Sequence, residues 1–538
     1  MRRRTVLVAA TVAVAGSAIA VAGCGGDSQT GAAPGEVASY VPAASPMYLE
    51  LTTDVDGPQW TQVEKLARLF PAYPEFERML DEELSGEGVD FERDVKPLLG
   101  DRAAVAALSL PDVSDTAGAL TSGETPTLPG GAGDEQFVGV VEVADGKEDA
   151  VKALLTREGA TRAGERGGAE YYTTPDDDTV VAVAPGAVVV ADDTTSLFQA
   201  LDAHEKGGDA TLAGTDKFTD ALGKLPADVF GQAYMDIGSI ARASGASQQL
   251  EQAGIAGIED TVFAASIAAE PDGVRVKGVV LDAPEQPQTE FTPTLTAQAP
   301  ADSIAYLGFS NLTGVVEQVL NQVRGTADEE TRQQIDAFAG QLPALLGVGV
   351  DDLAALGSGE HAVVVSPGTP DPGVALALKV ADGARAGATL DKLRAGIPGL
   401  LNSFSPGTTL PAWQQVDLAH GVKGWRLPLS PEAGVVYGVD GDLAVVGSTV
   451  SAITSLQAPT APLASSEAFQ QGTAGMPDKV TGLAWINLQE GVDVLNKYGA
   501  FDDAPAEVLA NLAPAKSLAA WTTGGSEPTF EVFLRLAQ

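Results

Sequence analysis

The sequence predicts an α+β fold, built as two tandem copies of a mostly antiparallel sheet with helices packed on one face. Residues near 41–285 and 299–538 carry the same order of elements, and each copy contains apolar runs of strand length between turn-forming residues. The 538 residues are also 44% hydrophobic. This fraction supplies enough apolar surface for a large buried core, which excludes a disordered chain.

Residues 1–23 predict a lipoprotein signal peptide. Residues 2–4 are arginines, residues 5–22 are mostly apolar, and Cys24 follows as the only cysteine of the chain. This order is a charged region, an apolar region and a small-residue cleavage site. It resembles the lipobox of bacterial lipoproteins, in which the cysteine receives lipid and becomes the new N-terminus. A buried thiol or an uncleaved anchor is the alternative interpretation of Cys24. The choice between the general and the twin-arginine export routes stays open.

The remaining chain divides into four segments. Residues 24–39 are rich in Gly, Ala and Ser, which predicts a flexible tether. We expect the first copy over residues 40–285, a linker over residues 286–298, and the second copy over residues 299–538. Residues 111–136 carry much Gly, Pro, Ser and Thr and predict a surface loop.

The internal duplication depends on an ordered series of matches. The tetrapeptide Val-Ala-Asp-Gly at residues 143–146 recurs at residues 380–383, and residues 212–237 align without a gap on residues 463–488. In this alignment Tyr234 stands opposite Trp485. Two arrangements remain open: each copy has its own sheet and core, or both copies share one continuous sheet.

Local patterns predict the elements of each copy. Apolar residues at helical spacing over residues 60–84 indicate a helix that Pro71 and Pro74 interrupt. Hairpins are predicted around Pro185-Gly186 and Asp440-Gly441, because these dipeptides favour tight turns. Further predictions are helices at 148–157 and 384–394 and strand pairs at 262–269 with 274–281 and at 517–522 with 529–536.

The charge balance limits the partners of this acidic protein. Lys and Arg total 32 and Asp and Glu total 73, which gives a formal net charge of −41. Phosphate backbones would be repelled by such a surface, so nucleic acid is excluded as a partner. The expected partners are the membrane, through the lipid on Cys24, and an unidentified envelope protein, glycan or small molecule.

No catalytic, cofactor-binding or metal-binding constellation is predicted. The three histidines lack metal-ligand spacing, and the motifs of phosphate loops and serine hydrolases are absent from the sequence. Three weaker patterns resemble a catalytic pair, calcium sites and a ligand pocket, and we interpret all three as structural. They are the Ser358/His361 pair, the acidic runs Asp54–Gly57 and Asp176–Asp178, and the strand pairs Tyr234/Asp236 and Trp485/Asn487.

The start of the first copy resembles a known family. Residues 41–50, then Thr52-Thr53-Asp54 and the helix at residues 59–66, are similar to the uncharacterised bacterial family named domain of unknown function 3352. The resemblance implies a secreted or lipid-anchored, acidic protein, and it brings no catalytic residues.

Together these observations favour a lipid-anchored extracytoplasmic protein of the cell envelope, on the outer face of the cell membrane. We expect a non-catalytic binding or interaction module. One alternative is an extracytoplasmic hydrolase that uses a carboxylate pair, which the many acids could conceal. Another is a carrier of an apolar small molecule.

The role of Cys24 is directly testable. Substitution Cys24→Ser removes the thiol that would receive the lipid, so labelling by a fatty-acid analogue in growing cells should be lost. The protein should then become soluble or keep its leader. Labelling of the variant as strong as that of the wild type would show that Cys24 is not the lipidation site.

Overall fold

The computed structural model describes most of the chain beyond the leader. The described residues are 35–86, 90–109, 136–175, 179–243, 257–283, 289–312, 314, 332–333, 340, 346–368, 371–404, 411–430, 434–501 and 504–537. Cys24 and the runs 111–135 and 176–178 lie outside these residues.

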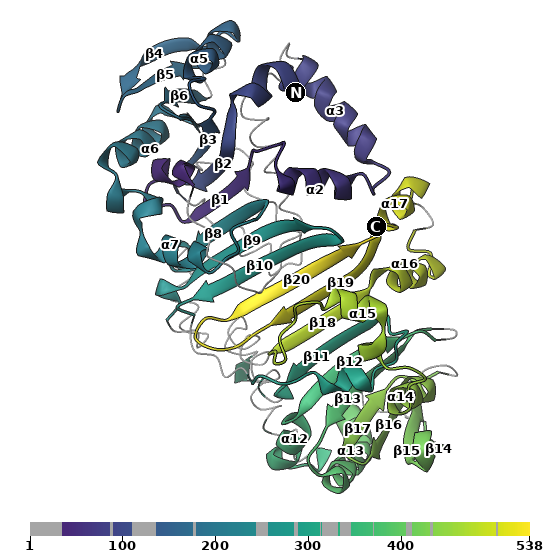
Figure 1. Cartoon of the computed structure of the whole chain (residues 1–538). Helices are drawn as coiled ribbons and strands as arrows, with labels where there is room; N and C mark the ends of the chain where they lie inside the picture. The colour runs from purple at the N-terminus through teal and green to yellow at the C-terminus, as the bar shows by residue number, and fades with distance from the viewer. Residues whose placement is uncertain are drawn as a thin grey trace.

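The described elements up to residue 283 form the first half of the molecule (Figure 1). They are η1 (Glu36–Tyr40), β1 (Met47–Thr52), α2 (Pro58–Ala67), α3 (Tyr73–Gly86), η2 (Phe91–Val95), η3 (Lys96–Leu98), β2 (Leu99–Ala107), β3 (Phe137–Val143), α5 (Glu148–Arg157), β4 (Thr161–Arg166), β5 (Ala169–Thr173), β6 (Val180–Ala184), β7 (Ala187–Ala191), α6 (Thr194–Lys206), η4 (Gly208–Ala210), η5 (Leu212–Gly214), α7 (Asp216–Gly223), β8 (Gly231–Asp236), α8 (Ile237–Ala243), η6 (Ile258–Asp260), β9 (Val262–Glu270) and β10 (Gly273–Leu281).

The described elements from residue 289 onward form the second half. They are η7 (Thr294–Ala297), β11 (Ala305–Ser310), α12 (Val350–Gly357), β12 (Glu360–Ser366), β13 (Gly373–Lys379), α13 (Gly383–Phe404), β14 (Gln414–Asp417), η8 (Ala419–Gly421), β15 (Lys423–Pro428), β16 (Gly434–Asp440), β17 (Leu443–Gly447), α14 (Val450–Gln457), η9 (Leu463–Ser465), α15 (Glu467–Gly472), β18 (Gly482–Asn487), α16 (Leu488–Lys497), α17 (Ala506–Leu512), β19 (Ala515–Thr522) and β20 (Thr529–Leu536).

The fold is α+β, as predicted, and the strands of the described residues form one 20-stranded antiparallel sheet. In the first half the pairings give the order β4-β5-β6-β7-β3-β2-β1-β8-β9-β10. In the second half they give β14-β15-β16-β17-β13-β12-β11-β18-β19-β20. The two orders match strand for strand.

The ladder between β10 and β20 joins the halves, and we call it the seam. Its register runs from Gly273 opposite Arg535 to Val279 opposite Thr529. Figure 1 shows β8, β9, β10, β20, β19 and β18 side by side across the middle of the molecule. The sequence left open whether the halves share a sheet, and the structure contains the continuous one.

The hairpins and the helix break arise from local sequence. Pro185-Gly186 joins β6 to β7 and the Asp440–Leu443 segment joins β16 to β17, with Gly186 and Gly441 at φ +72° and +60°. Glycine adopts this left-handed region without the penalty of a Cβ atom. The predicted helix over residues 60–84 is divided into α2 and α3. Pro74 stands in the first turn of α3, where a missing N–H does not cost a hydrogen bond.

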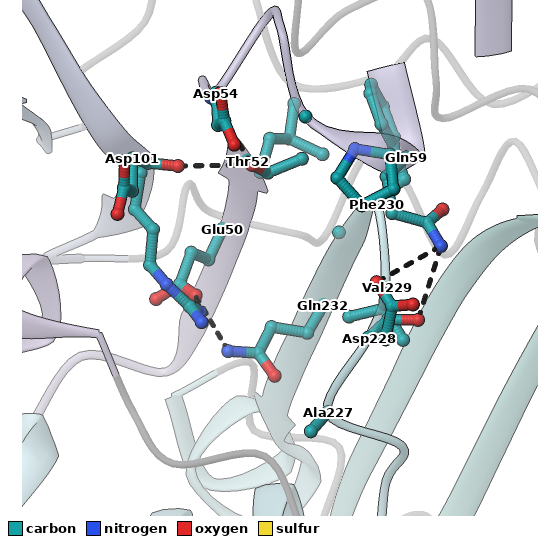
Figure 2. Close-up of a pocket in the computed structure, with 15 residues that line it drawn as sticks. Glu50, Thr52, Asp54, Gln59, Asp101, Ala227, Asp228, Val229, Phe230 and Gln232 are labelled. Atoms are coloured by element: carbon teal, nitrogen blue, oxygen red, sulfur yellow. Dashed lines mark hydrogen bonds and ion pairs between the residues drawn. The ribbon is translucent and has the colours of Figure 1, made fainter. Parts of the chain in front are cut away.

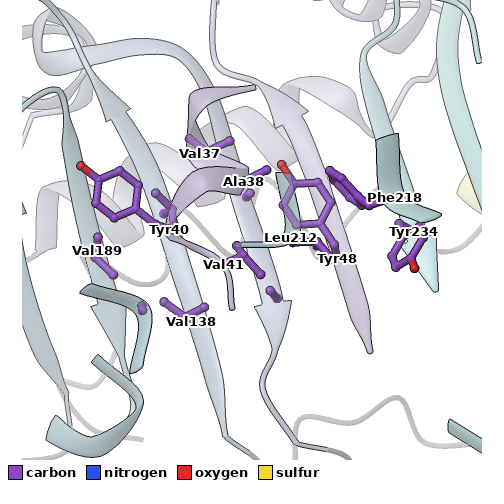
Figure 3. Close-up of a cluster of buried hydrophobic side chains, with 14 of the residues drawn as sticks. Val37, Ala38, Tyr40, Val41, Tyr48, Val138, Val189, Leu212, Phe218 and Tyr234 are labelled. Carbon is purple, nitrogen blue, oxygen red and sulfur yellow. The ribbon is translucent and has the colours of Figure 1, made fainter. Parts of the chain in front are cut away.

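Each half has its own main core on the same side of the sheet. In the first half, η1, α6 and α7 cover the strands, and the ring of Phe218 makes edge contacts with Tyr48 and Tyr234 at centroid distances of 5.1 Å (Figure 3). In the second half, η7, α14 and α15 cover the strands, and Phe469 makes an edge contact with Trp485 at 5.7 Å. Tyr234 and Trp485 therefore have equivalent places, as the alignment predicted.

Helices cover both faces of the sheet, so the prediction of helices on one face is wrong. Every residue of β6 and β7 is buried. Ala182 and Val189 belong to the core under α6, whereas Val181 and Val190 pack in a separate cluster with α5. In the second half α14 and α13 divide between the faces in the same way. Continuous apolar strands need cover on both sides, because both sets of side chains must leave water.

The packed body also begins earlier than residue 40. Val37 and Ala38 lie within the predicted tether, yet they are 1% and 0% exposed and belong to the first core. The predicted linker 286–298 is likewise packed where it is described, because Phe291 and Leu295 are buried in the second core. The composition of residues 24–39 predicted a flexible tether, but Val37 and Ala38 are part of the first core. Phe291 and Leu295 are part of the second core. No helix among the described residues has the length and apolarity to cross a membrane.

The seam carries buried charges. Lys277 faces Glu531 in the register, and Arg275 faces Phe533 with its guanidinium 4.1 Å from the ring centroid. Arg275 also forms ion pairs with Glu270 and Glu531. Glu531 is 1% exposed, and burial raises its pKa to about 8 against the attraction of Lys277 and Arg275.

The raised pKa predicts a pH-dependent stability. A folded-state pKa above the unfolded value means that the folded protein binds the extra proton, so stability falls as pH rises from about 4.5 to about 8. Substitution Glu531→Gln keeps the neutral form, and it should leave the free energy of unfolding unchanged near pH 5. Near pH 8.5 the variant should be more stable than the wild type by at least about 1 kcal/mol.

Denaturant unfolding at both pH values checks this expectation. Glu527→Gln, which removes an exposed carboxyl near the seam, is the matched control. An equal effect of Glu531→Gln at both pH values would contradict the assignment.

Candidate functional site

A cavity of about 230 Å³ lies in the first half, where β1 ends, β8 begins and α2 starts (Figure 2). Leu51 and Phe230 contribute apolar surface to its lining, and Trp60 supports the Phe230 ring by an edge contact at 5.0 Å. The lining also contains polar and charged side chains. The volume is below the range of about 300–1,000 Å³ that suits drug-sized molecules, so a ligand here must be small.

Glu50 is the buried acid of this cavity. It stands on β1 opposite Ala104 of β2 and Gln232 of β8, and it is 2% exposed. Arg102 pairs with Glu50 Oε1, and Gln232 Nε2 donates to the same oxygen at 2.8 Å. Tyr48 donates its hydroxyl to Oε2. A buried carboxylate is stable only when charge and hydrogen bonds replace water, and these three groups do so.

Tyr48 is held in its protonated form. Burial and the neighbouring Glu50 carboxylate raise the pKa of Tyr48 well above its usual value. The tyrosine therefore acts as a hydrogen-bond donor to Glu50 and is a poor proton acceptor.

Gln232 has one satisfied and one unsatisfied polar atom. Its side chain is buried, with 2% exposed, and extends from β8 between Glu50 and Ala227, both of which line the cavity (Figure 2). Nε2 donates to Glu50, whereas Oε1 has no hydrogen-bond partner among the described residues. An unpaired buried acceptor costs about 1–3 kcal/mol.

Three more acids surround the cavity. Asp54 follows β1, Asp101 lies on β2, and Asp228 precedes β8. Gln59 Nε2 lies 3.4 Å from Asp228 Oδ1, which is a weak contact. With Glu50 the lining contains four acids and one cation, Arg102, and so has a formal excess of three negative charges.

The second half differs at the equivalent places, where the buried Glu360 stands in the position of Arg102. Gly308 of β11 stands opposite Ala362 and Leu483, just as Glu50 stands opposite Ala104 and Gln232. Following the same registers, the residues that occupy the positions of Glu50, Asp54, Asp101, Asp228 and Gln232 are Gly308, Leu312, Gly359, Lys479 and Leu483. The polar cavity is therefore a feature of the first half and not a consequence of the overall acidity.

The structure gives three of the candidate residues, His361, Asp236 and Asn487, structural roles. His361 is fully buried, its Nε2 donates to the Gly357 carbonyl at 2.9 Å, and burial lowers its pKa. Asp236 and Asn487 each accept a backbone N–H at the start of a helix, from Ser239 at 2.7 Å and from Glu490 at 3.3 Å. These side chains cap helices, which explains why an acid and an amide can exchange at this position.

His204 makes a serine contact that the sequence did not indicate. Ser39 Oγ lies 3.0 Å from His204 Nδ1, and Tyr40 stacks on the imidazole at 3.7 Å. The contact ties η1 to α6 and is exposed. His420 pairs with Asp440 at 2.7 Å on the second half. Within the described part of the chain, no three Asp, Glu, His or Cys side chains are grouped so that they could hold a metal ion.

Of the cavity acids, the sequence reasoning noted only Asp54, as part of a calcium-like run. Asp56 of that run instead pairs with Lys96 at 3.2 Å. Glu50, Arg102 and Gln232 were missed. The sequence contained two indications that Glu50 is buried. Glu50 is on the same strand face as Tyr48, and the aligned residue of the second half is Gly308.

Comparison with solved structures finds three crystal forms of one protein, TP0453. Crystal form III gives a TM-score of 0.25 at 8% identity and covers 47% of this chain and 82% of that one. Forms IV and I give TM-scores of 0.24 at 8% and 9% identity, with 46% and 48% of this chain and 80% and 83% of the other covered. Among curated proteins no sequence matches. The family profile described as "Protein of unknown function (DUF3352)" matches residues 5–536. This match spans nearly the whole sequence, and the chain therefore belongs to the DUF3352 family.

Proposed function

We propose that this protein is a lipid-anchored extracytoplasmic protein of the cell envelope that binds a small ligand without changing it. The cavity around Glu50 supports binding, because the buried Glu50 and Gln232, several apolar residues and three further acids line one small space. The lipobox at Cys24 supports the anchored location. The observation that carries the proposal is the cavity of about 230 Å³ beside the buried Glu50 and Gln232, whose places in the second half are taken by Gly308 and Leu483.

A hydrolase with a carboxylate pair is less well supported. General acid catalysis needs a carboxyl group that stays protonated near neutral pH and faces the substrate. Among the described residues, burial raises the pKa of Glu142, Glu360 and Glu531, and none of these lines the cavity. The apolar carrier is also less well supported by this cavity, because its lining is rich in acids.

The binding function predicts a ligand that copurifies with the protein. Wild-type protein extracted from intact envelopes should retain a small molecule detectable by mass spectrometry, and Gln232→Leu should lose it. Leucine is found at the equivalent place in the second half, where it faces Gly308; because the variant also removes the Nε2 donor to Glu50, thermal unfolding should establish that it is folded. Asp478→Asn, an exposed acid in the loop before β18, is the control and should retain the ligand.

Two outcomes would contradict the proposal. Equal retention by wild type and Gln232→Leu would place the ligand elsewhere. Conversion of the retained compound during incubation, lost in a cavity variant, would favour the hydrolase.

We also propose that the chain consists of two copies of one α+β unit. The matching strand orders and the equivalent packing of η1 and η7 support it. Val41 O and Ala299 O, which follow these turns, accept from Leu212 N and Leu463 N respectively, both at 2.7 Å.

The two-copy organisation predicts that residues 35–283 fold alone. Their main core and the clusters around α5 and α2 consist only of first-half residues. A cooperative thermal transition is expected, at a lower temperature than in the full chain, because the seam and the cluster of Leu66 with Leu536 are lost. Starting at residue 35 keeps Val37 and Ala38. A fragment without a cooperative transition would show that the unit is the whole sheet.

A further inference from the structure

From the sheet face opposite the second core we infer a surface that docks on a lipid membrane. This apolar patch consists of Leu307 of β11, Ile486 of β18 and Val374 of β13, with Ala305 and Val365 between them. The inference rests on the proposed lipid anchoring at Cys24, and it adds a second contact between the protein and the same membrane.

The strand register places the side chains of the patch together. Val374 pairs with Val365, Val365 pairs with Ala305, and Ala305 pairs with Ile486, on four neighbouring strands (Figure 1). Leu307 stands two residues from Ala305 and therefore points to the same face. The five side chains form one continuous surface across the sheet.

This surface faces water. Tyr306 and Trp485, which alternate with residues of the patch along β11 and β18, are buried in the second core, so the patch lies on the other face of the sheet. Leu307, Val374 and Ile486 are between 36% and 48% exposed. Soluble proteins rarely leave a contiguous apolar surface open unless it is an interaction site.

The first half shows what a covered version of this surface looks like. Leu49 of β1 takes the place of Leu307, and it packs in a cluster with Trp60 and Val63 of α2. Among the described residues of the second half, Leu307 stays open to solvent. The patch therefore needs an apolar partner that the described body does not supply.

The chemistry of the patch suits hydrocarbon. On the described residues of β11, β12, β13 and β18, no side chain of this face is Asp, Glu, Lys or Arg. Each of the four strands has a paired strand on both sides, so the sheet itself satisfies their backbone N–H and C=O groups. Contact with hydrocarbon then leaves no backbone group of these ladders without a partner.

An amphipathic helix borders the patch. The helix α16 starts directly after β18, and Tyr498 at its end donates its hydroxyl to Asp371, which precedes β13. Leu488, Val492 and Leu495 repeat at helical spacing, and none of the residues of α16 is buried. An open apolar stripe beside a tyrosine with a polar tip suits the boundary between hydrocarbon and water.

The chain that precedes the described body selects a lipid surface as the partner. Ten residues, 25–34, separate Cys24 from Gly35, and ten extended residues span at most about 36 Å. A lipid on Cys24 therefore keeps the body within this distance of the membrane. A second copy of the chain is a poorer partner, because each copy has a formal net charge of −41 and two copies repel each other. Anionic head groups are disfavoured for the same reason, so we expect docking on zwitterionic lipid.

Vesicle flotation of the unlipidated protein tests the patch separately from the anchor. The chain from residue 24 onward with Cys24→Ser should float with phosphatidylcholine vesicles, and salt should not weaken this binding, because apolar burial supplies the affinity. Phosphatidylglycerol in the vesicles should weaken it. Leu307→Glu and Ile486→Glu should each weaken binding by at least about tenfold, because each brings a charge to the hydrocarbon.

Matched variants separate the patch from general apolarity and from misfolding. Met79→Glu changes an equally exposed apolar side chain on α3 of the first half, and it should bind like the parent protein. Thermal unfolding establishes that each variant is folded. Leu307→Cys and Met79→Cys, each the only thiol in the Cys24→Ser chain, should both react with a polar maleimide, and vesicles should protect Leu307→Cys alone.

Several results would overturn the inference. They are absence of flotation, loss of flotation in high salt, or an equal effect of Met79→Glu and Leu307→Glu. A dimer that Leu307→Glu dissociates would assign the patch to a second copy, and an unreactive Leu307→Cys without vesicles would show that the chain itself covers it. If flotation fails while Cys24 is still labelled by fatty acid in cells, the docking surface is wrong and the anchoring stands. If both fail, the anchored location is wrong as well.

Discussion

The ladder between β10 and β20 is the constraint on which the arrangement of the whole molecule depends. Each half ends in an edge strand whose backbone N–H and C=O groups need partners, and each supplies them to the other. The side chains make this choice specific. If β10 paired with a second β10 in the equivalent register, Lys277 would face Lys277 and like charges would meet. Pairing with β20 offers Glu531 to Lys277 and the ring of Phe533 to Arg275, so the seam favours one partner.

Much of the fold could be predicted from the sequence wherever the cause was local. The hairpin of β6 and β7 depends on a two-residue turn, and the break between α2 and α3 depends on proline, so both were correctly placed. The seam joins residues that are 250 to 262 positions apart, and no spacing or turn indicates such a pairing. The coverage of both faces was indicated by the unbroken apolar runs 180–184 and 187–191, which are typical of strands buried on two sides. We predicted helices on one face because antiparallel sheets commonly have one face exposed to solvent.

The candidate site could be predicted only in fragments, because its residues come from distant strands. Gln232 is 182 positions from Glu50, and Arg102 is 52 positions away. Asp54 stood out in the sequence through a calcium-like pattern, although its neighbourhood in the fold is a cavity lined by aspartates of other elements. A buried acid on a strand looks like any exposed acid until its partners are known. The aligned second copy offered the usable clue, since Gly308 and Leu483 replace Glu50 and Gln232.

The two outermost strands, β4 and β14, have consequences for how one molecule meets another. A twenty-stranded antiparallel sheet with two free edges could extend by adding further molecules, as fibres do. Here β4 has Arg162 and Arg166 at its edge, each in an ion pair, and β14 is short and polar with Asp417 paired to Lys423. An approaching strand would have to displace these charged groups from water. These charged groups therefore oppose pairing at the outer edges, whereas the inner edge strands β10 and β20 pair with each other.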